Sequence, residues 1–272
     1  QYNAGFNLST VSNKVVELAD KSQVLYGEGL KFGSEHFPTQ THVGKPIGAF
    51  YLYQADGIFQ TTEEVARHAD ANGKPIQPNA QPGDMRFKDQ NGDGLLNEED
   101  KVYSGTGIPK VEANINFDAT YRGIDFSFVI GSGWGHKIYN GNKYFYEAMN
   151  SGSNMLRSTL QAWTPTNTQT SVPRAVYQDP NGNSRESTRF LESGDFIRLR
   201  QIQLGYTFPS VLTHKFYLDK LRIYASAENL LTITGYDGID PEFSRNSVLN
   251  AGIDKLIYPF TRSFTIGAQI TF

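Results

Sequence analysis

The most constraining feature of the chain is its final stretch, residues 262–272, where apolar side chains alternate with polar or small ones. The apolar positions are Phe264, Ile266, Ala268, Ile270 and Phe272. Successive side chains of a β-strand point to opposite faces, so this stretch predicts a strand with one apolar and one polar face. About ten residues of such alternation, ending on an aromatic residue, are typical of a transmembrane β-barrel strand. The same pattern also fits a half-buried strand of a soluble sheet.

Composition narrows the classes of protein that remain. The chain has 272 residues, enough for one large domain or two modest ones. It has no cysteine, which excludes a disulfide scaffold and a thiolate metal site. Its net charge of −3 gives no basic surface for nucleic acid. No apolar run approaches the roughly 20 residues of a membrane-spanning helix, which excludes a helical membrane protein only.

The alternating pattern recurs along the chain and predicts about seven spanning strands. With the C-terminal stretch, they are residues 2–8, 14–19, 111–121, 124–130, 202–208 and 221–227. The second of these, Lys14–Ala19, follows a short turn at Ser12-Asn13. A helix is predicted over Thr61–Ala69, with Thr61 and Glu64 as a capping box, and part of residues 143–163 is expected to be helical.

The connections between these strands alternate between short and long. The long ones cover residues 20–109, 131–194 and 229–261. Outer-membrane up-and-down barrels have short periplasmic turns and long extracellular loops, whereas a soluble sandwich lacks this two-sided asymmetry. The pattern therefore favours an all-β, antiparallel transmembrane barrel with three extracellular loops. Because an open sheet of about seven strands leaves costly unpaired edges in lipid, we infer the C-terminal portion of a larger barrel.

One motif carries recognisable chemistry. Residues 89–100 have the spacing of a twelve-residue calcium loop, in which oxygen atoms surround one cation at about 2.3–2.6 Å. The expected ligands are Asp89, Asn91, Asp93, the carbonyl of Leu95, Asn97 and Asp100. The last position is Asp where Glu is usual, and the flanks do not read as a helix pair. A polar surface turn without metal gives the same composition.

Signals for catalysis are missing. The five histidines are scattered, and no zinc motif, nucleophile elbow or phosphate-binding glycine loop occurs. No carboxylate pair suits glycoside hydrolysis, so the chain is not expected to be an enzyme. Aromatic residues in the long connections either stack on a ligand or pack the loops themselves; they are Trp134, Tyr144, Phe145, Tyr146 and Trp163.

Several motifs together resemble one family. They are residues 7–14, 44–51 with 54–59, 82–94, 196–209, 227–234 with 238–242, and 258–262. Examples are Phe196-Ile-Arg-Leu-Arg-Gln-Ile-Gln-Leu-Gly-Tyr-Thr-Phe-Pro209 and Gly238-Ile-Asp-Pro-Glu242. In order and spacing they resemble the SusC/RagA family of TonB-linked outer-membrane transporters of Bacteroidetes-type bacteria, and the resemblance covers essentially the whole chain.

The resemblance implies more than the residues show alone. It implies a barrel of about 22 strands with a plugged lumen, in the bacterial outer membrane. It also implies import of glycan or peptide oligomers with energy from TonB, beneath a SusD-like surface lipoprotein. The plug and the TonB-contacting segment of the family lie before the strands found here. The terminal residues Phe264, Ile266, Ala268, Ile270 and Phe272 resemble the signal that the barrel-assembly machinery reads.

An alternative remains open from the sequence. A secreted, calcium-stabilised, β-rich carbohydrate-binding module has the same strand content and the same cation loop. The two interpretations differ in one observable. The barrel requires the apolar strand faces to be uncovered by protein, and the module requires them to be sealed under another layer.

Overall fold

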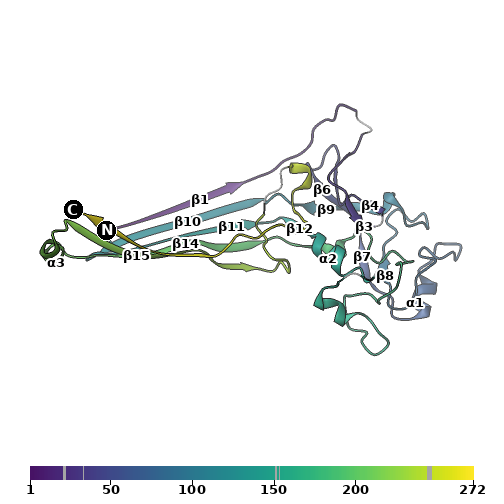
Figure 1. Cartoon of the computed structure of the whole chain (residues 1–272). Coiled ribbons are helices and arrows are strands. Elements are labelled where there is room, and N and C mark those ends of the chain that lie inside the picture. Colours follow the sequence, from purple (N-terminus) through teal and green to yellow (C-terminus); the bar gives the residue numbers. More distant parts are fainter. Residues whose placement is uncertain (21–22, 33, 151, 153, 244–246) are drawn as a thin grey trace.

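The computed structural model describes residues 1–20, 23–32, 34–150, 152, 154–243 and 247–272. Within this part of the chain, six long strands form one antiparallel sheet in the order β1-β10-β11-β14-β15-β17. Figure 1 shows this sheet extending from one end, where both termini lie, to a group of folded loops at the other end. We call these folded loops the loop module; it comprises residues 11–110, 135–195 and 235–262.

The sheet strands are β1 (Tyr2–Thr10), β10 (Val111–Tyr121), β11 (Ile124–Trp134), β14 (Phe196–Thr207), β15 (Lys220–Thr234) and β17 (Ser263–Thr271). The first loop contains β2 (Leu25–Tyr26), β3 (Leu30–Phe32), β4 (Ser34–His36), β5 (Thr39–Thr41), β6 (Ala49–Tyr53), β7 (Ala55–Ile58), α1 (Thr62–Arg67), β8 (Met85–Phe87), η1 (Glu98–Asp100) and β9 (Lys101–Thr106). The second and third loops contain β12 (Lys137–Asn140), α2 (Gly141–Tyr146), η2 (Arg157–Gln161), η3 (Thr188–Phe190), β13 (Leu191–Ser193), η5 (Val248–Asn250) and β16 (Ile253–Asp254). Between β14 and β15 lie α3 (Ser210–Thr213) and η4 (His214–Phe216).

Each pair of neighbouring strands keeps apolar residues opposite apolar ones. Leu204 lies opposite Phe126 on one side and Ala225 on the other, and Ala225 lies opposite Ile266. This outward face is uncovered by the described residues: Leu204, Ile223 and Ile266 are 56%, 44% and 83% exposed. Such a face requires an apolar environment outside the chain, and it does not agree with the sealed core of a carbohydrate-binding module.

The opposite face of the sheet is polar. Opposed residues on this face include Asn3 with Asp118, Ser127 with Gln203, and Ser226 with Thr265. The terminal residues Phe264, Ile266, Ala268 and Ile270 pair with β15 in register, so the predicted last strand is confirmed. A polar face behind an apolar one is the arrangement of a barrel wall with a wet lumen.

The prediction of about seven strands is wrong by one. Residues 14–19 form no strand, and the chain does not turn back at Ser12-Asn13. Instead β1 pairs with β10, about 110 residues later, and the chain between them is the first loop. The backbone of Val15 bonds Gly44 and Lys45 of the same loop, at 2.8 and 2.9 Å. The short apolar run at Val15 and Val16 resembles the start of a strand in sequence, but it pairs with no strand of the sheet.

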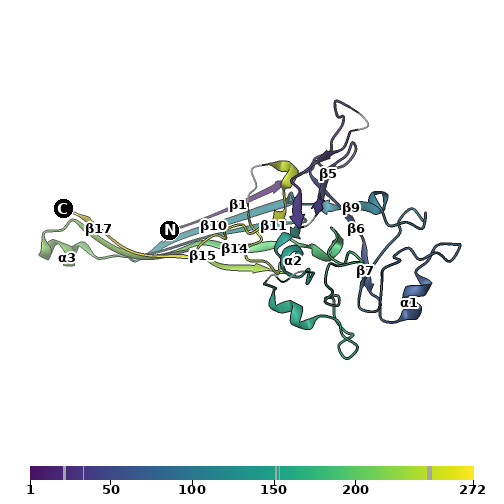
Figure 2. The ribbon, with the colours of Figure 1, turned by 45° about the vertical axis from the view of Figure 1, so that its right-hand side comes forward.

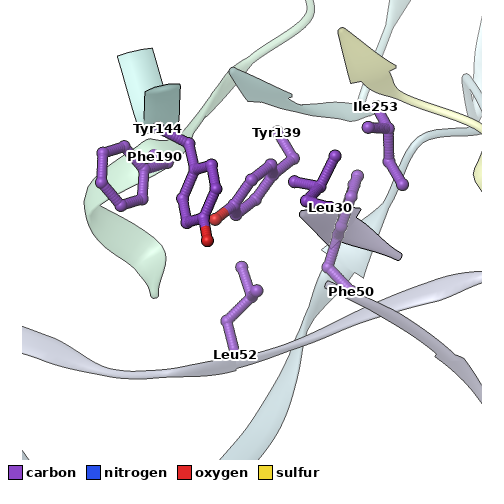
Figure 3. Packing of buried hydrophobic residues seen from close by; sticks show 7 residues of the cluster. All are labelled: Leu30, Phe50, Leu52, Tyr139, Tyr144, Phe190 and Ile253. Atoms are coloured by element: carbon purple, nitrogen blue, oxygen red, sulfur yellow. The ribbon is translucent and has the colours of Figure 1, made fainter. Parts of the chain in front are cut away.

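The buried core of the chain lies in the loop module and not in the sheet. All three loops contribute to one hydrophobic cluster, which Figure 3 shows: Leu30, Phe50, Leu52, Tyr139, Tyr144, Phe190 and Ile253. The turned view in Figure 2 shows the same module gathered at the end of the sheet remote from the termini. The long connections are therefore a folded unit with its own core.

Helices are short and confined to connections. The predicted helix at Thr61–Ala69 is observed as α1; Glu64 N donates to Thr61 Oγ1 at 3.2 Å, and Gln60 N donates to the Glu64 carboxylate at 2.7 Å. The expected helical part of residues 143–163 is observed as α2 and η2. No helix in the described residues is long and apolar enough to span a membrane.

Candidate functional site: the loop module

The second hydrophobic cluster of the module joins the first and second loops. It consists of Tyr53, Ile58, Met85 and Phe87, with Leu96 and Trp163 packed against it. The indole nitrogen of Trp163 donates to Gln60 Oε1 at 2.9 Å. Tyr144 is buried in the first cluster. These aromatic side chains pack the loops together, whereas Trp134 lies at the end of β11 and is partly exposed.

A pair of arginines on β14 holds the third loop. Arg198 is buried and bonds the carboxylate of Asp240; its Nε lies 3.4 Å from Glu242 Oε2. Arg200 donates to the other oxygen of Glu242 at 2.7 Å. Asp240 also accepts the Phe260 backbone N–H at 3.0 Å. Arg198 and Arg200 are two residues apart on one face of the strand. They pair with two acids that are also two residues apart, in Asp240-Pro-Glu242.

A second ionic group ties the first loop to the second. Glu186 is buried and accepts from Lys101 Nζ at 2.5 Å and from His36 Nδ1 at 2.6 Å. Burial opposes ionisation of Glu186, but hydrogen bonds and charge from His36 and Lys101 outweigh it and lower the pKa to about 2. The carboxylate is therefore charged at neutral pH and binds two segments far apart in sequence.

A third ionic group centres on the buried Asp84. Arg174 donates to both oxygens of Asp84, at 2.7 and 3.1 Å. The amide of Asn183 also donates to Asp84, at 2.9 Å, and its oxygen accepts the Met85 backbone N–H at 2.8 Å. The contacts of Asp84 with Arg174 and Asn183 therefore also join the first loop to the second. Sequence reasoning did not identify these ionic groups, because the partners lie between about 40 and 150 residues apart.

Several clefts open on the module among the described residues, and two of them are considered for the site. The larger, of about 690 Å³, is lined by residues of all three loops, and its charged lining groups already form pairs. Arg189 donates to Glu147 at 3.1 Å, and Lys143 lies 2.8 Å from Asp237. The smaller, of about 360 Å³, lies where the polar sheet face meets the loops and is lined in part by Glu112, Arg200 and Glu242. Polar and apolar groups both line the two clefts.

The predicted calcium loop forms a tight turn on the surface of the first loop. Gly92 and Gly94 have φ values of +76° and +78°, which β-carbon-bearing residues rarely adopt. A Cβ on Gly94 would lie 2.7 Å from the Cβ of Asp70. The carboxylate of Asp89 accepts the backbone N–H groups of Gly92 and Gly94 at 2.7 and 2.8 Å. The glycines thus allow the sharp reversal that the spacing predicts.

The structure brings several of the predicted ligands within hydrogen-bonding distance of one another. Asn91 Nδ2 lies 3.1 Å from Asp93 Oδ2 and 3.2 Å from Glu99 Oε2, and Asn97 Nδ2 lies 3.5 Å from Asp93 Oδ2. Hydrogen bonds, first from the Leu95 N–H, lower the pKa of Asp93. Asp100 is buried and accepts the backbone N–H groups of Gln90 and Asn97. No group of three or more acidic or histidine side chains in the described residues is already arranged around a metal position.

Comparison with known proteins identifies the chain. No family model matches it. It is 32% identical, over its whole length, to "TonB-dependent receptor P3" of Formosa agariphila and covers 27% of that protein. It is 25% identical to "TonB-dependent receptor SusC" of Bacteroides thetaiotaomicron, again over its whole length and 24% of that protein. Over its whole length the chain is thus a homologue of TonB-dependent receptors, SusC among them.

The fold agrees with this assignment. All of the chain superimposes on part of the structure titled "Structure of the RagAB peptide transporter", with a TM-score of 0.73, 21% identity and 27% of that chain covered. The chain is therefore a portion of a larger outer-membrane barrel, as the resemblance implies. It spans about a quarter of the length of these relatives, whose names describe receptors and a transporter.

Proposed function

We propose that this chain is the C-terminal barrel segment of a transporter that imports glycan or peptide oligomers across the bacterial outer membrane with energy from TonB. The observation that carries the proposal is the match of the whole chain to part of a TonB-dependent receptor, together with a sheet that has one apolar and one polar face. A SusD-like surface lipoprotein and TonB are the partners, and TonB acts through a part of the protein outside these residues. The strands preceding β1 complete the wall.

The loop module gives this segment its role in uptake. Its three loops share one core and are joined by buried ion pairs, so they form a stiff rim and not three independent flaps. The cleft of about 690 Å³ opens on this rim and presents amide, hydroxyl and charged groups to an extended substrate. We propose that the rim faces the cell exterior and forms part of the substrate entry beneath the lipoprotein.

Native purification tests this function. The full-length transporter carries a tag at a surface position and is extracted from outer membranes. Mass spectrometry then identifies the proteins and small molecules that remain bound to it. We expect a SusD-like lipoprotein and either oligosaccharides or peptides, and the ligand class decides between the two substrates. Recovery of neither partner nor ligand, with uptake of both oligomer classes unchanged in a deletion strain, would argue against the proposal.

We propose in addition that residues 89–100 bind calcium and stiffen the first loop. Asn91, Asp93, Asn97 and Glu99 already converge, and Gly92 and Gly94 give the reversal that wraps oxygens around one point. Calcium would be held by Asp89, Asn91, Asp93, Asn97 and Asp100 with the Leu95 carbonyl. It would replace the hydrogen bonds that now join these side chains. Extracellular calcium modules need only millimolar affinity.

Thermal unfolding of the full-length transporter in chelator and in calcium tests the site. At ten times the dissociation constant, calcium is expected to stabilise the folded state by about 1.4 kcal/mol. Asp93→Asn should abolish this gain, whereas Glu63→Gln, which removes a carboxylate of the same loop outside the motif, should keep it. No stabilisation of the unmodified protein at millimolar calcium would remove the site.

A further inference from the structure

The connection between β14 and β15 exposes an unusual amount of apolar surface. It lies at the end of the sheet opposite the loop module, beside both termini (Figure 1), and contains α3 and η4. Val211 and Phe216 are each 75% exposed, Tyr217 is 92% exposed and Leu212 is 49% exposed. Four large apolar side chains within seven residues are costly in water and indicate a partner.

The connection has a fixed backbone. Leu212 N and Thr213 N both donate to the carbonyl of Pro209, at 2.9 and 3.3 Å. At the other end Tyr217 N donates to His214 O at 3.1 Å, and Leu218 N donates to Thr213 O at 3.2 Å. Thr213 is buried between these turns. The apolar side chains are therefore displayed by two hydrogen-bonded helical turns.

This surface continues the outward face of the sheet. Phe208 N donates to Leu221 O at 2.9 Å, which extends the β14–β15 pairing beyond Thr207. The ring of Phe208 contacts that of Tyr206, with centroids 5.0 Å apart, and Tyr206 lies on the outward face in register with Ile223. Aromatic residues thus run from the barrel wall into the connection. In outer-membrane barrels such residues mark the boundary between hydrocarbon and lipid headgroups.

The charges of the connection match a lipid surface. His214 and Lys215 are exposed on η4, Asp219 is the acidic residue of the connection, and Lys220 begins β15 on the polar face that Tyr224 shares. On the neighbouring β10–β11 turn, the guanidinium of Arg122 lies 5.2 Å from the ring centre of Tyr121. Long basic side chains place their stems along apolar surface and their charges among headgroups. Anionic phospholipid headgroups are the partner of matching sign.

We propose that α3 and η4 form an interfacial foot, which inserts Val211, Leu212, Phe216 and Tyr217 into the periplasmic leaflet of the outer membrane and places Lys215 among anionic headgroups. The partner is phospholipid, in direct continuation of the lipid-facing band of the barrel. By inserting into the leaflet, the foot fixes the depth of this end of the barrel in the membrane. This assignment depends on the outer-membrane location and not on the substrate that is imported.

Fluorescence quenching by lipid tests the foot. The 272 residues contain no cysteine. In a full-length transporter made free of other cysteines, Val211→Cys and Phe216→Cys are each labelled with a small fluorophore. The protein is reconstituted in vesicles of phosphatidylethanolamine and phosphatidylglycerol, with and without brominated acyl chains. Leu204→Cys on the outward face is the lipid-exposed control, and Thr168→Cys, on the exposed surface of the second loop, is the water-exposed control.

Labels at 211 and 216 are expected to lose fluorescence to bromolipid, at a depth of about 5–10 Å below the headgroup boundary, and to resist aqueous iodide. Folding of each variant is checked by its heat-dependent electrophoretic mobility. Iodide quenching equal to that at Thr168→Cys, without bromolipid quenching, would show the connection to be free in the periplasm. Protection from both quenchers would show that a protein covers it. Either result overturns the proposal.

Discussion

Arg198 joins the wall strand β14 to the third loop through a single side chain. It is buried, pairs with Asp240 and Glu242, and has the Phe260 ring over its guanidinium at 5.1 Å. Replacing it leaves Asp240 without its cation, and losing one partner of a buried ion pair costs about 3–5 kcal/mol.

We therefore predict that Arg198→Leu releases the third loop. Hydrogen exchange of the full-length transporter should show backbone protection lost across residues 247–262 while β14 remains protected. Arg200→Leu, which removes a half-exposed partner of Glu242, should have a smaller effect. Equal protection in both variants and the unmodified protein would show that the pairing does not hold the loop.

Glu186 gives the module a defined response to acid. Its pKa of about 2 lies below the usual value of 4.5, so its ionised form is stabilised by folding. The sign follows from linkage: this contribution is present above pH 4.5 and is lost as the pH falls towards 2. We predict that protease resistance of the loops declines across this window, and that Glu186→Gln reduces resistance at neutral pH and flattens the decline. An unaltered pH profile in that variant would contradict the role of Glu186.

At the residue level, sequence alone identified positions but not contacts. The arginine and acidic motifs were visible as part of a family pattern, yet nothing local shows that Arg198 meets Asp240 and that Arg200 meets Glu242. Tyr144 and Trp163 were visible as loop aromatics with two possible roles. Burial decides between those roles, and burial depends on segments far along the chain.

At the scale of elements, strands with regular alternation were predictable and pairing was not. The terminal strand and residues 111–121 have two clear faces, and both are observed. The short run at residues 14–19 has the right residue types but no partner, and pairing of β1 with β10 spans a whole folded loop. The local sequence pattern predicts that a segment forms a strand, whereas the fold of the whole chain determines which strand pairs with it.

The exposed terminal strand supports a prediction on assembly. Phe264 and Phe272 are 73% and 85% exposed, and β17 is an edge of the sheet in this chain. An accessible strand with an aromatic end can pair while the barrel closes. We predict that deleting Phe272 from the full-length protein lowers its yield in purified outer membranes, with Thr168→Ala as the matched control. Unchanged yield would argue against this role of the terminal residue.

At the scale of the whole molecule, the chain is a wall segment with a folded rim. Its sheet buries little of its own apolar surface, while its loops contain the core. This distribution is the reverse of a soluble sandwich, where strands face inward and loops are exposed. The class of fold followed from strand periodicity and loop lengths. That the three loops share one hydrophobic core did not follow from the sequence, because no periodic pattern connects residues of different loops.

The central claim is that the outward face of the sheet contacts hydrocarbon and the opposite face contacts water. Spin labels placed singly along β14 and β15 of the reconstituted full-length transporter measure this directly, through collision with oxygen, which enters lipid, and with a nickel chelate, which does not. We predict oxygen access at Leu204, Tyr206 and Ile223, and nickel access at Gln203 and Tyr224, alternating with a period of two. Equal accessibility on the two faces, or protection of Leu204 and Ile223 from both reagents, would contradict the account.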